Sequence, residues 1–144
     1  MLRTPLVLLL AATTACASPV DAQAAEDSGA HCRLFRAIEQ ETSAGLGRLI
    51  DPVTRLSAID LACADQVIHF RQELTIPEAA LRPGWLARHR AHWSATYCRP
   101  GSAFEAAIRQ GWTVATTITT SDGARFRLTA QCQSTAAIGT PSAT

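Results

Sequence analysis

The chain contains no lysine and no asparagine, so arginine supplies all 13 of its basic residues. The 12 acidic residues nearly balance them and leave a formal net charge of +1. A protein that binds nucleic acid through its phosphates usually carries a strong basic field. The charge balance therefore argues against nucleic acid as a partner.

Long hydrophobic runs are also missing after the N-terminal region. A helix that crosses a bilayer needs about 20 apolar residues, and no stretch of that kind follows the first 24 residues. The length of 144 residues suits one domain. Part of the 47% hydrophobic content lies in the leader and part is alanine, so we expect a single core of modest size.

The N-terminus carries an export signal. Arg3 supplies a positive charge, the run from Leu6 to Ala12 is apolar, and small residues follow. This run is too short to span a membrane. We expect residues 1–24 to be the export signal, 25–30 a linker, 31–132 the folded domain and 133–144 a disordered tail.

Two processing routes remain open. The segment Thr13-Thr14-Ala15-Cys16 resembles a lipobox, with threonine in place of the usual leucine. In that route residues 1–15 are the signal, and a lipid on Cys16 provides the membrane attachment. In the other route a peptidase releases a soluble protein after Ala17 or Ala24, both of which fit the small-x-small rule. The first route gives a membrane-anchored protein, and the second gives a periplasmic or secreted one.

Four further cysteines indicate disulfides. They are Cys32, Cys63, Cys98 and Cys132. An even number is typical of exported domains, and four cysteines allow three connectivities. The chain has no Cys-x-x-Cys pair, and the spacing matches no zinc site, so we expect no metal and no other cofactor.

Apolar periodicity predicts the order of the elements. The predicted elements are a helix over 31–44, strands over 55–62 and 66–75, helices over 85–97 and 103–110, and a hairpin over 112–132 that turns at Asp122-Gly123. Leu34, Phe35 and Ile38 share the apolar face of the first helix. Ser102 and Glu105 form a capping box.

This order predicts an α+β domain. We expect a single antiparallel sheet of about four strands, made of two hairpins and packed by two or three helices. Cys98 ends a helix and Cys132 faces inward at the end of the last strand, so a bond between them would clamp helix to sheet. The remaining pair, Cys32 and Cys63, would join the first helix to the first hairpin.

One stretch resembles a family of small exported bacterial proteins of unknown function. It runs from Asp51-x-x-Thr54-Arg55-Leu56 through a strand pair, a helix that ends in Cys98, and Gly111-x-x-Val114, to Cys132. The family's recurring cysteines match Cys98 and Cys132, whereas its tyrosine-rich strands differ from this chain. The resemblance implies no activity. In size, export and architecture the chain is also similar to secretion-system pilotins and periplasmic inhibitors.

Candidate catalytic and metal-binding residues are few. His89 and His92 lie three apart on a predicted helix and are the weak metal candidates, but a third ligand is missing and arginines flank them. Asp60 and Asp65 flank a turn, where aspartate commonly makes local hydrogen bonds. The serines at 57, 94 and 102 occur in no nucleophile motif.

Partner binding is therefore the leading hypothesis for function. Arg88 and Arg90 on the helix, with Arg125 and Arg127 on the polar sheet face, are the candidate partner surface. We expect a non-enzymatic envelope protein that binds another protein or an anionic surface. The alternatives are a small periplasmic metal-binding protein or enzyme that uses His89 and His92, and a structural lipoprotein attached through Cys16. Trp85, Trp93 and Trp112 could add an aromatic surface, although core packing explains Trp93 and Trp112 more simply.

Overall fold

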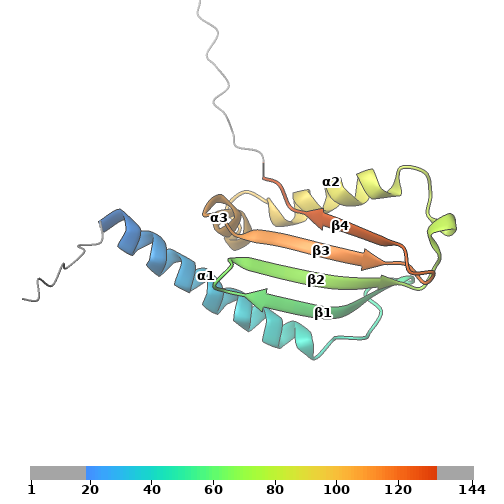
Figure 1. Ribbon diagram of the computed structural model, residues 1–144, viewed down its shortest axis with the longest axis horizontal. Coiled ribbons are helices and arrows are strands. Elements are labelled where there is room, and N and C mark those ends of the chain that lie inside the picture. The colour runs from blue at the N-terminus through green and yellow to red at the C-terminus, as the bar shows by residue number, and fades with distance from the viewer. Residues whose placement is uncertain (1–18, 133–144) are drawn as a thin grey trace, which may run out of the picture.

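The computed structural model describes residues 19–132, which form an α+β domain, as predicted (Figure 1). The elements are α1 (Pro19–Ser43), β1 (Thr54–Ala62), β2 (Val67–Leu74), the 3-10 helix η1 (Glu78–Ala80), α2 (Trp85–Tyr97), α3 (Ala103–Arg109), β3 (Thr113–Thr119) and β4 (Arg125–Thr129). Residues 1–18, which contain Cys16 and most of the predicted signal over 1–24, and the predicted tail over 133–144 lie outside the described residues.

The strands lie in the order β1-β2-β3-β4, and the central pair is parallel. Both predicted hairpins are present, since β1 pairs with β2 and β3 with β4 in antiparallel fashion. The prediction of a purely antiparallel sheet was wrong. The connection from β2 to β3 contains η1, α2 and α3, and a crossover of this length returns the chain to the end of the sheet where β2 began. Val67 consequently lies beside Thr113.

Helix α1 begins at Pro19, earlier than expected. The prediction of a linker over 25–30 was wrong, because these residues continue the helix. Proline is well suited to a first helical position, where its missing N–H has no partner to lose. Phe35 is fully buried and Ile38 packs against the core, but Leu34 is 38% exposed and lies outside the buried face.

The core lies on one face of the sheet. In Figure 1, α1 runs along the β1 side and α2 along the β4 side, and α3 lies at the end where β3 begins. Phe35 contacts Phe104 and Trp112, with ring centroids 5.0 and 4.9 Å apart. Trp93 of α2 meets Phe70 of β2 edge-on at 5.6 Å. These rings fill the space between the helices and the sheet.

Two disulfides connect helices to the sheet. Cys32 on α1 is bonded to Cys63 after β1, and Cys98 at the end of α2 is bonded to Cys132 after β4. This is the predicted pairing. Cys98 and Cys132 are 34 residues apart, and closing a loop of that length stabilises a fold by about 4 kcal/mol in the chain-entropy model.

Replacing Phe35 with alanine should lower the free energy of unfolding by about 3–5 kcal/mol, because its ring is fully buried against Phe104 and Trp112. Leu34→Ala is the matched control on the exposed side, and it should cost less than about 1 kcal/mol. Urea unfolding with the disulfides intact measures both values. Equal losses would contradict the assignment of the buried face.

Candidate functional site

A pocket of about 410 Å³ opens at the end of the sheet where β1 begins and β2 ends. We call it the Trp85 pocket. Its lining is formed by Asp51, Val53, Thr54, Leu74, Ile76, Ala80, Leu81, Arg82, Trp85 and His89. Most of these side chains are apolar, and a few polar groups join them. This combination of size and lining is typical of a binding site.

Trp85 is the first residue of α2 and forms a wall of the pocket. Gly84 before it has a φ of 71°, a left-handed conformation that glycine adopts without strain. The indole ring stacks on His89, one turn later, with ring centroids 5.0 Å apart, and meets Phe126 of β4 at 5.6 Å. These contacts hold the ring in place while it remains half-buried. A second hollow of about 310 Å³ also touches Trp85.

Asp51 and His89 set the electrostatics of the pocket. Burial acts to raise the pKa of Asp51, but hydrogen bonds from the backbone N–H groups of Val53 (2.9 Å) and Thr54 (2.8 Å) help to hold that pKa below its usual value. Burial, with a smaller effect of His92, lowers the pKa of His89. At neutral pH the pocket therefore contains a carboxylate and a neutral imidazole.

The two metal candidates, His89 and His92, lie on neighbouring turns of α2. The ring face of His89 is occupied by Trp85, and the side chain of His92 is exposed. Within the described range, no group of three or more His, Cys, Asp or Glu side chains could hold a metal ion. The pair alone provides fewer ligands than a protein zinc site uses.

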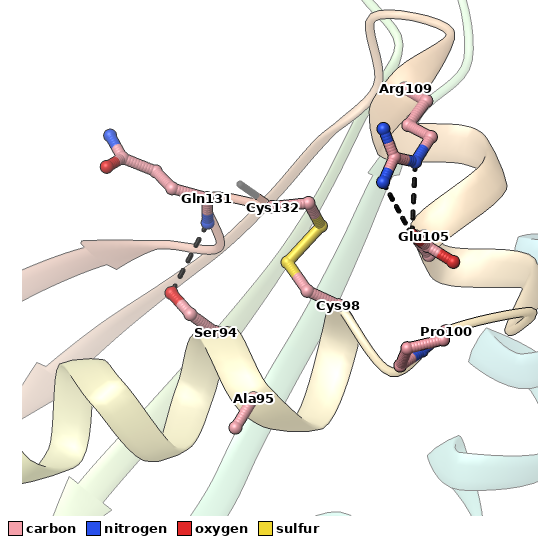
Figure 2. Close-up of a pocket in the computed structure, with 8 residues that line it drawn as sticks. All are labelled: Ser94, Ala95, Cys98, Pro100, Glu105, Arg109, Gln131 and Cys132. Carbon is pink, nitrogen blue, oxygen red and sulfur yellow. Dashed lines mark hydrogen bonds and ion pairs between the residues drawn. A yellow bond between two sulfur atoms is a disulfide. The ribbon is translucent and has the colours of Figure 1, made fainter. Parts of the chain in front are cut away.

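A pocket of about 420 Å³ lies beside the bond between Cys98 and Cys132, and Figure 2 shows the side chains that line it. Ser94 on α2 accepts a hydrogen bond from the backbone N–H of Gln131 at 3.3 Å. Arg109 forms an ion pair with Glu105 of the same helix, α3, at 2.8 Å. The bond from Gln131 joins α2 to the chain after β4, and the ion pair of Arg109 lies within a single helix, so we assign these side chains a structural role.

The face of the sheet opposite the helices carries a polar cluster that the sequence analysis did not identify. Nε2 of His69 lies 2.9 Å from Oγ1 of Thr117, and its Nδ1 lies 4.0 Å from the Asp60 carboxylate. Arg71 donates a hydrogen bond to the same carboxylate at 2.9 Å. The register explains these contacts, because Asp60 is the cross-strand partner of His69, and Arg71 that of Thr117. We call these four residues the open-face cluster.

The order carboxylate, imidazole, hydroxyl resembles that of a nucleophile-activating triad. The carboxylate of Asp60 is instead engaged by Arg71, and 4.0 Å is too long for a hydrogen bond to His69. Burial and the charge of Arg127 lower the pKa of His69, and the opposing effect of Asp60 is smaller. The geometry suits binding better than general-base catalysis.

The four arginines of the predicted partner surface lie on two sides of the sheet. Arg88 and Arg90 belong to α2, which packs on the apolar face, and Arg88 donates a hydrogen bond to the carbonyl of Pro83 at 2.9 Å. Arg125 and Arg127 lie on β4, and both are exposed. Arg127 is the cross-strand neighbour of Thr117, which places it on the open face. These residues therefore form two separate surfaces.

The remaining catalytic candidates have local structural roles. Asp60 forms its ion pair within the sheet, and Asp65 is exposed in the turn between β1 and β2. Ser57 donates a hydrogen bond to a backbone carbonyl of β2. Ser94 and Ser102 each accept one from a backbone N–H. The geometry does not bring these five side chains together.

Comparison with known proteins shows a shared fold. No protein-family model matches the sequence, and no curated protein matches it. One similar structure is a Pseudomonas aeruginosa protein assigned as secreted, with a TM-score of 0.53 and 11% identity over 71% of this chain and 91% of that one. Another is the pilotin of the Vibrio vulnificus type 2 secretion system, with a TM-score of 0.53 and 16% identity over 76% of this chain and 99% of that one. At these identities the likeness extends to the fold alone.

His69 should titrate below its usual pKa of 6.5. Between the folded and unfolded pKa values, the unfolded chain binds more protons at this residue. Its contribution to the free energy of unfolding should therefore fall as the pH drops from 6.5 towards the folded pKa. NMR titration of the His69 ring, assigned with a His69→Gln variant, measures the value directly. A folded pKa at or above 6.5 would contradict this electrostatic description.

Proposed function

We propose that this chain is an exported, non-enzymatic envelope protein that binds a protein partner. Two disulfides support export, because such bonds form and persist in oxidising compartments. The fold shared with a protein assigned as secreted and with a secretion-system pilotin is consistent with this location. The stretch from Asp51 to Cys132 further suggests membership of the small exported bacterial family that it resembles.

The Trp85 pocket is the observation that carries the proposal. A tryptophan held in place by His89 and Phe126, yet half-buried, offers a rigid apolar surface. Tryptophan and arginine are enriched among the residues that dominate protein interfaces, and Arg82 lines the same pocket. A volume of about 410 Å³ can take one or two apolar side chains of a partner segment.

Two exposed apolar residues lie in the loop directly before Asp51, a residue of the pocket lining. Leu49 and Ile50 directly precede Asp51 and are 52% and 61% exposed. Large apolar side chains grouped on a surface are typical of interaction sites. We infer that the partner covers the loop before β1 together with the pocket.

Attachment to the membrane would then depend on the N-terminus. None of the helices within residues 19–132 is both long and apolar enough to cross a bilayer. A lipid on Cys16 would anchor the protein, and cleavage after Ala17 or Ala24 would release it. Either form would present the same pocket to a partner in the envelope.

Blocking the pocket should weaken partner binding. Ala80 lines the pocket and is exposed, so Ala80→Glu places a charged side chain in the pocket without removing core contacts. Ala79→Glu, the neighbouring exposed position of η1 outside the lining, is the matched control. Chemical crosslinking in envelope extract should give a specific adduct that weakens at least about tenfold with Ala80→Glu and persists with Ala79→Glu. An adduct that both variants retain equally would contradict the proposal.

A further inference from the structure

The open face of the sheet is positively charged. The register sets its side chains in rows across the strands. The rows are Asp60, His69, Ala115 and Thr129; then Ala58, Arg71, Thr117 and Arg127; then Arg55, Glu73, Thr119 and Arg125. The rows contain four arginines and two carboxylates, so the positive charges outnumber the negative ones.

Two of the four arginines of this face lie on β4, at an edge of the sheet. Arg71 is paired with Asp60 at 2.9 Å. Arg125 and Arg127 are exposed, and neither forms an ion pair with any residue between 19 and 132. Two guanidinium groups are thus available to an external anion. The guanidinium group binds carboxylates through paired N–H donors.

A groove of about 380 Å³ lies beside these arginines. It is lined by the side chains of Ser57, His69, Arg71, Thr117, Thr119 and Arg125. Guanidinium groups and hydroxyls supply hydrogen-bond donors along this groove. Glu73 also contributes to the lining. The Glu73 carboxylate has Arg55 as its cross-strand neighbour, and Arg71 and Arg125 line the same groove.

The spacing of the two free arginines favours an extended ligand. Arg125 and Arg127 are two positions apart on β4, an edge strand, so their side chains project from the same face about 7 Å apart. Side chains at alternate positions of an extended peptide repeat at the same distance. An extended segment with acidic residues at alternate positions can pair with both arginines at once.

We propose that the open face binds an acidic segment of a partner protein in an extended conformation, with its carboxylates on Arg125 and Arg127. Thr117, Thr119 and His69 provide polar contacts along the adjoining groove. This site is separate from the Trp85 pocket and does not depend on the function proposed for that pocket.

The competing explanation is protection of the sheet edge. Charged side chains on an edge strand discourage pairing with another chain. That explanation predicts that removing Arg125 and Arg127 promotes aggregation and leaves peptide binding unchanged. The two explanations therefore differ in a measurable quantity.

The test uses fluorescein-labelled synthetic peptides and fluorescence anisotropy with the purified protein at low salt. One peptide alternates glutamate and threonine, and the other has the same composition with all glutamates in one block. The alternating peptide should bind more tightly, and its affinity should fall with added salt. Arg125→Ala/Arg127→Ala should weaken its binding at least about tenfold. Arg88→Ala/Arg90→Ala removes the same charge from α2 and should change the affinity less than about twofold.

Several outcomes would overturn the inference. Equal losses in the two double variants would indicate a general charge effect, and equal affinity for the two peptides would remove the argument from strand spacing. Binding of phosphatidylglycerol vesicles without binding of either peptide would identify the open face as a membrane-contacting surface. Ala80→Glu should leave peptide binding unchanged, so failure at this site can be distinguished from failure at the Trp85 pocket.

Discussion

A continuous line of aromatic contacts beneath the sheet holds the fold together. Phe104 stacks on Phe35 at 5.0 Å and meets Tyr97 edge-on at 4.8 Å, and Tyr97 lies 5.8 Å from Phe70. The line passes through α1, α3, α2 and β2, so the same few rings fix each helix relative to the sheet. With these rings all on one face, the opposite face remains open. The Trp85 pocket lies at the end of the sheet away from α3.

Features that depend on residues close together in the chain could be predicted from the sequence. The predicted N-cap of the helix α3 is present, because the backbone N–H of Glu105 donates to Oγ of Ser102 at 3.1 Å. The second bond of the predicted capping box differs, since the Glu105 carboxylate accepts from the backbone N–H of Gly101 at 2.8 Å and not from that of Ser102. The hairpin of β3 and β4 follows from the alternation of apolar and polar residues along both strands and from the turn at Gly123. The parallel pairing of β2 with β3 could not be predicted, since strand direction depends on the path of the crossover and not on the pattern within either strand.

The binding surfaces were harder to predict than the elements. His69 and Thr117 are 48 residues apart, and each alone is an ordinary polar residue on a strand. Only the register of the parallel pair brings them into contact. Trp85 was a candidate from composition, but the walls around it come from the loop before β1, the end of β2 and the start of α2. Segments so distant in sequence give no common local signal.

The bond between Cys32 and Cys63 also determines how the molecule responds to tension. The first part of α1 projects beyond the sheet (Figure 1), and the bond joins the helix to the turn after β1. A force applied to the N-terminal end of α1 passes through the disulfide to that turn. It does not pass through the chain segment that joins the two cysteines, which are 31 residues apart in sequence. The contacts of Phe35 lie within the bypassed loop and are shielded from the load. A protein held by its N-terminus would therefore keep α1 attached to the sheet.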